Sequence, residues 1–224
     1  MTRKNKGKAG VPERSGATRE RLLDVAEELF ARRGLDAVSV RDITQAAGAS
    51  LGAITYHFGT MRKLIVEVFD RRMAPLTRRR LEALDAVERA AGAGPLPLEE
   101  VLEAMFRPAV MDAMDHEGTG LVFGKLMARS MMDPNPYLEK YIHAHIEPVI
   151  RRFDAALMRA MPELTAEEVF WRMHLLVGGL HQSLLMMDRT PPPGIPRLRR
   201  DPESYLRRFV AFAAAVFRTP LPKE

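Results

Sequence analysis

The chain has 224 residues and no cysteine, which excludes a disulfide-stabilised fold, a cysteine nucleophile and thiolate metal sites. Its 34 Lys and Arg residues against 29 Asp and Glu residues give a net charge of +5. This excess is confined to residues 1–63, with 12 basic and seven acidic residues, whereas residues 64–224 hold 22 of each. A small basic unit followed by a larger neutral one is typical of nucleic-acid binding by the first unit.

The composition predicts an all-α protein, because 53 residues are Ala or Leu and only 22 are Val or Ile. No segment alternates apolar and polar residues between turn signals, so no strand is expected. The stretch 173–187 is apolar but too short and too polar to span a bilayer, and the N-terminus lacks the apolar core of a signal peptide. We therefore expect a cytoplasmic protein.

The first segment, residues 1–16, is basic and rich in glycine, which predicts a disordered arm. Such an arm either attracts DNA phosphates or keeps the chain soluble. A helical pattern follows from Thr18 to Gly34. Ser39 and Asp42 have the spacing of a capping box, which begins a short helix ending at Gly48. We expect Ser50 to cap a third short helix over residues 51–57, so that residues 17–62 form one domain.

The rest of the chain, residues 63–224, is predicted to be a helical body. A long helix over residues 61–91 contains Pro75, which is expected to kink or break it. Further helices are expected over residues 98–114, 120–132, 136–161, 165–189 and 202–217, giving about nine in all.

Residues 39–58, SVRDITQAAGASLGAITYHF, fit a helix-turn-helix. Gly48 permits the tight turn, and the small side chains around it let the two helices cross closely. A slim second helix can enter a DNA major groove, which is about 12 Å wide. Another helical hairpin with a glycine turn would look similar, so the pattern alone leaves that reading open.

The sequence resembles the TetR family of transcriptional regulators. The resemblance rests on TRERLLDVAEELFARRGLDAVSVRDI, the turn AAGAS, the segment GAITYHF and the KLI that begins at Lys63. The segment FWRMH at residues 170–174, with the recognition helix, is similar to a subgroup that includes fatty-acid-responsive regulators. The resemblance implies a homodimer that binds a palindromic operator, with Pro75 as the bend that couples the body to the head.

The resemblance also implies which side chains meet DNA. Tyr56 and His57 match phosphate-contacting positions, while Thr55 replaces an aromatic residue and Leu51 stands where a polar residue is common. Met61 stands where a lysine is usual, so Arg62 or Lys63 is expected to take its role. The expected contacts are Ser39, Arg41, Ser50, Leu51, Gly52, Ala53, Thr55, Tyr56, His57, Arg62 and Lys63, whereas Phe30, Ile43 and Phe58 are expected in the core.

The body holds 12 of the 14 methionines, which favours an apolar cavity for a small molecule such as a fatty acid or an acyl derivative. The expected lining is Met105, Phe106, Phe123, Met127, Met131, Phe153, Trp171, Arg172 and Leu175. Arg172 either reaches solvent or pairs with Glu167, Glu168 or Asp154, or else it binds a ligand carboxylate.

Two glycines within an expected helix, Gly178 and Gly179, each cost about 1 kcal/mol relative to alanine, which suggests that another helix approaches them. The resemblance implies that the last two helices form a four-helix interface between two copies. The expected interface residues are Gly178, Gly179, Leu206, Phe209, Val210 and Ala213.

An enzyme is the second hypothesis, but the chain lacks the common phosphate-binding, nucleophile and metal-ligand motifs. His143 and His145 would diverge on a helix, so no metal and no cofactor are expected. A third hypothesis, a non-specific architectural DNA-binding protein, is disfavoured by the neutral body. We therefore predict a ligand-released repressor, with an activator or a ligand-co-repressed regulator as alternatives.

Overall fold

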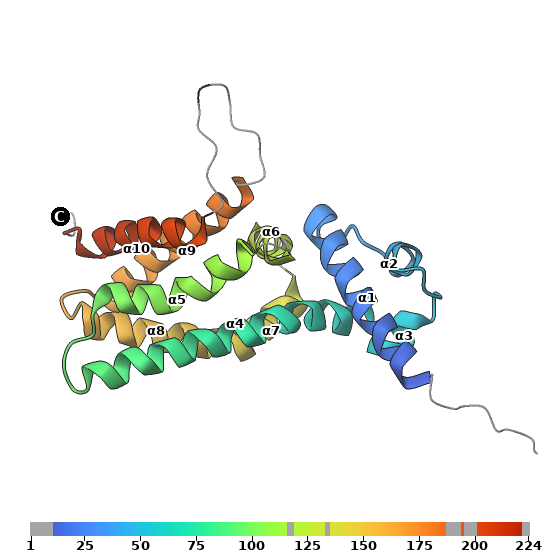
Figure 1. Ribbon diagram of the computed structural model, residues 1–224, viewed down its shortest axis with the longest axis horizontal. Coiled ribbons are helices and arrows are strands. Elements are labelled where there is room, and N and C mark those ends of the chain that lie inside the picture. Colours follow the sequence, from blue (N-terminus) through green and yellow to red (C-terminus); the bar gives the residue numbers. More distant parts are fainter. Residues whose placement is uncertain (1–10, 116–118, 133–134, 187–193, 195–200, 221–224) are drawn as a thin grey trace, which may run out of the picture. The chain divides into compact units, whose positions relative to one another are not determined.

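A computed structural model describes residues 11–115, 119–132, 135–186, 194 and 201–220 of the chain. Over these residues the secondary structure is ten helices with no strand, which confirms the all-α prediction (Figure 1). The helices are α1 (Val11–Arg33), α2 (Val40–Ala46), α3 (Ala53–Phe58), α4 (Met61–Ala91), α5 (Leu98–Ala113), α6 (Thr119–Met132), α7 (Pro136–His145), α8 (Glu147–Ala160), α9 (Ala166–Met186) and α10 (Pro202–Arg218).

One expected helix is in fact two, which raises the number above the nine predicted. The stretch 136–161 divides at Ile146, which ends α7 and serves as the N-cap of α8. Pro148 then occupies the first turn of α8. Proline has no N–H to donate and its ring clashes with the preceding turn, so a position at the start of a new helix is favourable. By contrast, Pro75 does not break α4, which is continuous over 31 residues.

The structure also corrects the predicted extent of the N-terminal arm. α1 begins at Val11, so residues 11–16 are helical rather than disordered. Pro12 lies in the first turn of this helix, where its missing N–H costs nothing. Residues 1–10 of the predicted arm lie outside the described residues.

The chain forms two compact units, one up to Asp70 and one from Arg71 onward, which we call the head and the body. The division falls later than the predicted boundary after residue 62. The reason is that the first turns of α4 belong to the head core, where Leu64, Ile65 and Val68 are buried.

The head core is formed by large apolar side chains from all four of its helical segments. Phe30, Ile43 and Phe58 are buried there, as predicted, together with Ile54 of α3. α1 packs on α2, and α2 on α3. The short helices α2 and α3 are therefore held by tertiary burial, since helices of this length are not stable alone.

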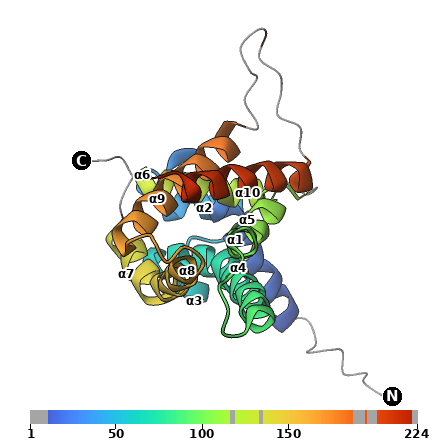
Figure 2. The ribbon, with the colours of Figure 1, turned by 90° about the vertical axis from the view of Figure 1, so that its left-hand side faces the viewer.

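The body is a bundle in which α5 packs on α10, α6 and α8, and α9 packs on α6 and α8. Figure 2 shows α9 and α10 side by side, and the two helices are in contact. Phe106, Phe153 and Phe217 are almost fully buried in its core. Over the described residues, no helix is both long enough and apolar enough to span a membrane.

Candidate nucleic-acid interface and ligand cavity

The predicted capping box is present at the start of α2. The Asp42 N–H donates to the Ser39 hydroxyl at 3.2 Å, and the Ser39 N–H donates to the Asp42 carboxylate at 2.9 Å. The Ser39 hydroxyl also donates to that carboxylate. These hydrogen bonds lower the pKa of Asp42 below its ordinary value. The capping box fixes the residue at which α2 begins, and α2 is the first helix of the helix-turn-helix.

The turn between α2 and α3 differs from the prediction at Ser50. Gly48 has a φ of +60°, the left-handed conformation expected of it. α3 begins at Ala53 rather than at Leu51, and its N-cap is Gly52, which supplies no side-chain hydrogen bond. Ser50 instead contributes its backbone carbonyl, which accepts from the Ala53 N–H at 2.9 Å. The Ser50 hydroxyl is therefore not the helix cap, because a further turn separates it from the helix.

Most of the predicted DNA contacts lie at the surface of the head. Tyr56 on α3 is 79% exposed, and its ring lies 4.8 Å from that of the half-buried His57. Ala53 is an exception at 8% exposure, because its side chain packs into the head. Its assignment as a DNA contact is therefore wrong. The exposed members of the predicted set are Ser39, Arg41, Ser50, Leu51, Gly52, Thr55, Tyr56, Arg62 and Lys63.

Two features that hold the head together were not foreseen. The Arg19 guanidinium on α1 lies 5.3 Å from the centre of the Phe58 ring and forms an ion pair with Glu67 on α4. Arg19 therefore joins α1 to the end of α3 and the start of α4. Thr60 caps α4 by accepting a hydrogen bond from the Lys63 N–H at 3.2 Å. A threonine three residues before Lys63 was a sequence signal for this cap.

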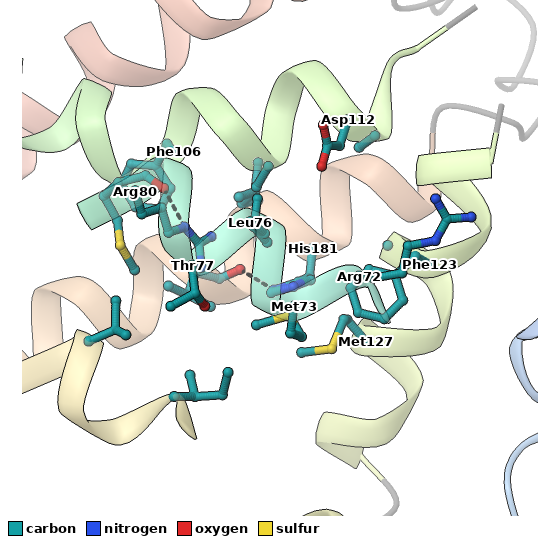
Figure 3. Close-up of a pocket in the computed structure, with 18 of the residues that line it drawn as sticks. Arg72, Met73, Leu76, Thr77, Arg80, Phe106, Asp112, Phe123, Met127 and His181 are labelled. Atoms are coloured by element: carbon teal, nitrogen blue, oxygen red, sulfur yellow. Dashed lines mark hydrogen bonds between the residues drawn. The ribbon is translucent and has the colours of Figure 1, made fainter. Parts of the chain in front are cut away.

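The body contains a cavity of about 640 Å³, lined by residues of α4 to α9 (Figure 3). This volume is within the range of small-molecule sites. Figure 3 shows Phe106 at one side of the cavity and Phe123 and Met127 at the opposite side, with Met73 and Leu76 between them. Of the predicted lining, the structure brings together Met105, Phe106, Phe123, Met127, Met131 and Phe153.

The other predicted cavity residues, all on α9, lie elsewhere. Trp171 and Leu175 are on the exposed face of the helix, and Leu175 is 67% exposed. The cavity instead receives Met173, Val177 and other residues that occupy a different face of the same helix. A helix that is apolar over much of its circumference does not reveal from sequence which face meets a cavity.

Arg172 is buried but does not line the cavity. Its terminal nitrogens donate to the backbone carbonyls of Val216 at 2.8 Å, Phe217 at 2.6 Å and Thr219 at 2.9 Å. Its Nε donates to Glu168 at 3.0 Å, which was one of the two alternatives for this residue. The guanidinium therefore satisfies the free carbonyl groups at the C-terminal end of α10 and joins α10 to α9.

The polar side of the cavity comes chiefly from α4, which the sequence analysis did not assign to the site. Arg79 forms a bidentate ion pair with Asp112 of α5, in which the Arg79 Nη1 donates to the Asp112 Oδ1 at 2.8 Å. The Arg80 Nε donates to the Met105 carbonyl at 2.8 Å, and burial lowers the pKa of Arg80 to about 10. Burial also lowers the pKa of His181 and raises that of Asp154. The arginine-rich segment RRMAPLTRRR at residues 71–80 is the sequence feature from which this polar side of the cavity could have been predicted.

The residues predicted for self-association are exposed on α9 but buried or half-buried on α10. Gly178 and Gly179 are exposed, with open space where a Cβ would lie. Leu206, Val210 and Ala213 are buried within their own chain, and the half-buried Phe209 ring lies 4.9 Å from that of Phe106. These α10 residues are therefore not an exposed interface. The exposed apolar residues of α10 are instead Ala211, Phe212 and Ala215.

Over the residues that the structure describes, no group of three His, Cys, Asp or Glu side chains could hold a metal ion. His143 lies 3.0 Å from Glu147 of the next helix, and the His145 Nδ1 lies 3.1 Å from the Tyr141 carbonyl. The two imidazoles therefore make separate contacts.

The comparisons with known proteins agree with the geometry of both units. Residues 22–68 match the family model described as bacterial regulatory proteins, tetR family, and residues 103–215 match that of the tetracyclin repressor-like C-terminal domain. The HTH-type transcriptional repressor KstR2 of Mycolicibacterium smegmatis is 30% identical over 123 residues, which are 55% of this chain and 56% of that protein. KstR2 of Rhodococcus jostii is 46% identical over 50 residues, 22% of this chain and 24% of that protein.

Solved structures share the fold along most of the chain. The ketosteroid transcriptional regulator KstR2 of Mycobacterium tuberculosis has a TM-score of 0.57 at 22% identity, over 90% of this chain and 95% of that one. The fatty acid degradation regulator FadR of Bacillus halodurans has a TM-score of 0.62 at 15% identity, over 97% of this chain and all of that one. With an N-terminal helix-turn-helix and a helical body that each match a model of the same family, this chain belongs to the TetR family of bacterial regulatory proteins.

Proposed function

We propose that this protein is a dimeric transcriptional repressor that releases its operator when a small apolar molecule enters the body. The observation that carries the proposal is the surface of α3 and of the turn before it, where Leu51, Thr55 and Tyr56 are exposed beside a capped α2 and a tight glycine turn. A short helix presented in this way can enter a major groove. The relatives of Rhodococcus jostii and Mycolicibacterium smegmatis are HTH-type transcriptional repressors, which supports the same function. Such a repressor acts on chromosomal DNA, and so in the cytoplasm.

DNA contact by the head is divided between bases and phosphates. The exposed residues before and within α3, among them Ser50, Leu51 and Thr55, are positioned to face base edges, whereas Tyr56 and His57 are phosphate contacts. Arg62 and Lys63 lie in the first turn of α4, where the positive end of the helix dipole and the two cationic side chains both favour a phosphate.

The test is a gel shift on DNA selected by the wild-type protein from a random pool. Combining Tyr56→Phe with His57→Ala removes two phosphate contacts and is expected to weaken binding at least about 10-fold. Arg151→Gln, which removes an exposed charge of the body, is the matched control and is expected to bind as the wild type does. Unchanged affinity in the double variant would refute this docking mode, and diffuse protection in footprinting would favour an architectural protein.

Dimer formation is assigned to the exposed apolar face of α9 and α10. Trp171, Leu175 and Phe212 lie on this face, and Gly178 and Gly179 leave room for the close approach of a helix. Exposed aromatic and leucine side chains gathered on two adjacent helices are typical of an interface. A two-fold dimer also doubles the number of bases read, which a single short helix needs for specificity.

Analytical ultracentrifugation at micromolar concentration tests the assembly. The wild-type chain is expected to sediment as a dimer, and Leu175→Glu combined with Phe212→Glu is expected to give a folded monomer, because buried unpaired carboxylates are costly. Arg151→Gln is again the control. A monomeric wild-type chain would refute this part of the proposal.

The cavity is the proposed inducer site. Its mainly apolar lining suits a lipid-like or polycyclic molecule. Among the structural relatives, KstR2 is a ketosteroid transcriptional regulator and FadR is a fatty acid degradation regulator. Release by ligand requires that the ligand bind the free protein more tightly than the DNA-bound protein. A ligand that tightens operator binding in the gel shift would instead identify a co-repressed regulator, and ligand-stimulated transcription with the protein on its site would identify an activator.

A further inference from the structure

Several arginines of α4 border the cavity, and three consecutive ones differ in their partners. Arg78 faces Glu82 at 3.7 Å, and Arg79 is paired with Asp112. Arg80 forms no ion pair with any residue in the described part of the chain. Arg80 is therefore a cation at the cavity that no carboxylate of the described residues contacts in an ion pair.

The geometry of Arg80 leaves its terminal nitrogens available. Its Nε donates to the Met105 carbonyl of α5 at 2.8 Å, which holds the side chain in place. Figure 3 shows Arg80 on the same side of the cavity as Phe106, across from Phe123 and Met127. The two terminal NH₂ groups form the fork that matches the two oxygens of a carboxylate.

We propose that the cavity binds an elongated or polycyclic apolar molecule with a single carboxylate, and that Arg80 is the residue that binds this carboxylate. The inference rests on the proposed role of the cavity as the inducer site, and it names the ligand class. The charge of Asp112 acts on Arg80, but that carboxylate is bound by Arg79. A part-buried cation that no carboxylate contacts is unfavourable, and a ligand carboxylate would supply this contact while the apolar remainder of the ligand covers Phe123 and Met127.

Two other titratable groups of the cavity, His181 and Asp154, agree with this placement. The His181 Nδ1 is 2.8 Å from the Val177 carbonyl, and burial together with the nearby Arg80 charge lowers the pKa of His181, so it is neutral at pH 7. Asp154 on α8 has no hydrogen-bond or ion-pair partner among the described residues. Its carboxylate disfavours a second anion nearby, which directs the charged end of the ligand to Arg80 rather than to α8.

Isothermal titration calorimetry with matched acids and esters tests the inference. The probes are dodecanoate and lithocholate, which differ in shape, each compared with its uncharged methyl ester. In the wild-type protein at least one acid is expected to bind about 10- to 100-fold more tightly than its ester, the range for a charge-assisted hydrogen-bonded pair. Arg80→Gln is expected to remove this preference, Arg80→Lys to retain part of it, and Arg151→Gln to leave it unchanged.

Three results would overturn the inference: no binding of either acid, equal binding of acid and ester, or an acid preference that survives Arg80→Gln. If circular dichroism shows that Arg80→Gln is unfolded, two other measurements decide the question. They are the ratio of acid affinity to ester affinity in the wild-type protein and the same ratio in Arg80→Lys. The gel shift on selected DNA is measured separately. Sequence-specific DNA binding without acid preference would refute this inference alone, whereas acid preference without DNA binding would refute the proposed repressor function.

Discussion

Replacing Arg172 by methionine tests the structural role that the body assigns to this residue. Methionine keeps much of the side-chain volume but donates no hydrogen bond. The change removes the bonds to the carbonyls of Val216, Phe217 and Thr219 and the contact with Glu168. We therefore expect a less stable body whose α10 is no longer anchored at its C-terminal end.

The expected loss in the free energy of unfolding follows from how deeply the carbonyl groups bound by Arg172 are buried. The bond to the Phe217 carbonyl is buried, and leaving this acceptor unsatisfied costs about 1–3 kcal/mol. The bonds to Val216 and Thr219 are only part-buried, so water replaces them at about 0.5–1.5 kcal/mol each. The free energy of unfolding is thus expected to fall by about 2–6 kcal/mol, which at about 2–4 °C per kcal/mol corresponds to roughly 4–24 °C in Tm for a chain of this size.

Thermal and urea unfolding at one fixed protein concentration measure this loss, because self-association would otherwise shift the midpoint. Arg151→Met, at an exposed position of α8 paired only with Glu147, is the matched control and is expected to lie within about 0.5 kcal/mol of the wild type. An Arg172→Met protein as stable as that control would refute the assignment. If folded Arg172→Lys no longer binds the acid probes more tightly than their esters, Arg172 takes part in ligand binding.

Three further outcomes are expected. Hydrogen bonds lower the folded pKa of Asp42, so its stabilising effect is complete above the ordinary value of 3.8 and is lost as the pH falls through the lower folded value. Asp42→Asn is therefore expected to narrow the difference in Tm between about pH 6 and about pH 3, and an unchanged difference would contradict this role. Gly48→Ala is expected to cost about 1 kcal/mol in urea unfolding and Gly48→Asn less, because only the positive φ is strained and the surrounding space is open. Met127→Trp is expected to fill the cavity and abolish calorimetric binding of the acid probes while selected DNA still binds, and retained ligand affinity would place the site elsewhere.

The head was largely predictable because its signals are local. The Ser39–Asp42 box, Gly34 and Gly48 each impose a backbone geometry within a few residues of themselves. The start of α3 was predicted two residues too early, because the turn at Ser50 is held by a backbone carbonyl and leaves no mark on the side-chain pattern. Helix boundaries of this kind are the least certain part of a sequence-based prediction.

The body was less predictable because its decisive partners are distant in sequence. Arg172 meets carbonyls more than forty residues away, and Arg80 meets the carbonyl of Met105, and neither acceptor depends on side-chain identity. The prediction of buried α10 residues as interface residues has a different cause. Apolar residues surround much of this helix, so Val210 and Phe212 were equally plausible interface residues until packing against α5 buried the former.

Phe170 and His174 belong to two surfaces at once. Their rings stack at 5.8 Å between centroids, they line the cavity, and they lie on the exposed side of α9. If the cavity is the inducer site and the exposed side of α9 the subunit interface, as proposed, a substitution at either position changes ligand fit and subunit contact together. Met127 and Phe123 on α6 border the same cavity without lying on the exposed side of α9 or α10. Under the proposed function, redesign of this protein as a sensor for other compounds is best begun on α6, where a substitution changes the cavity without touching the proposed interface.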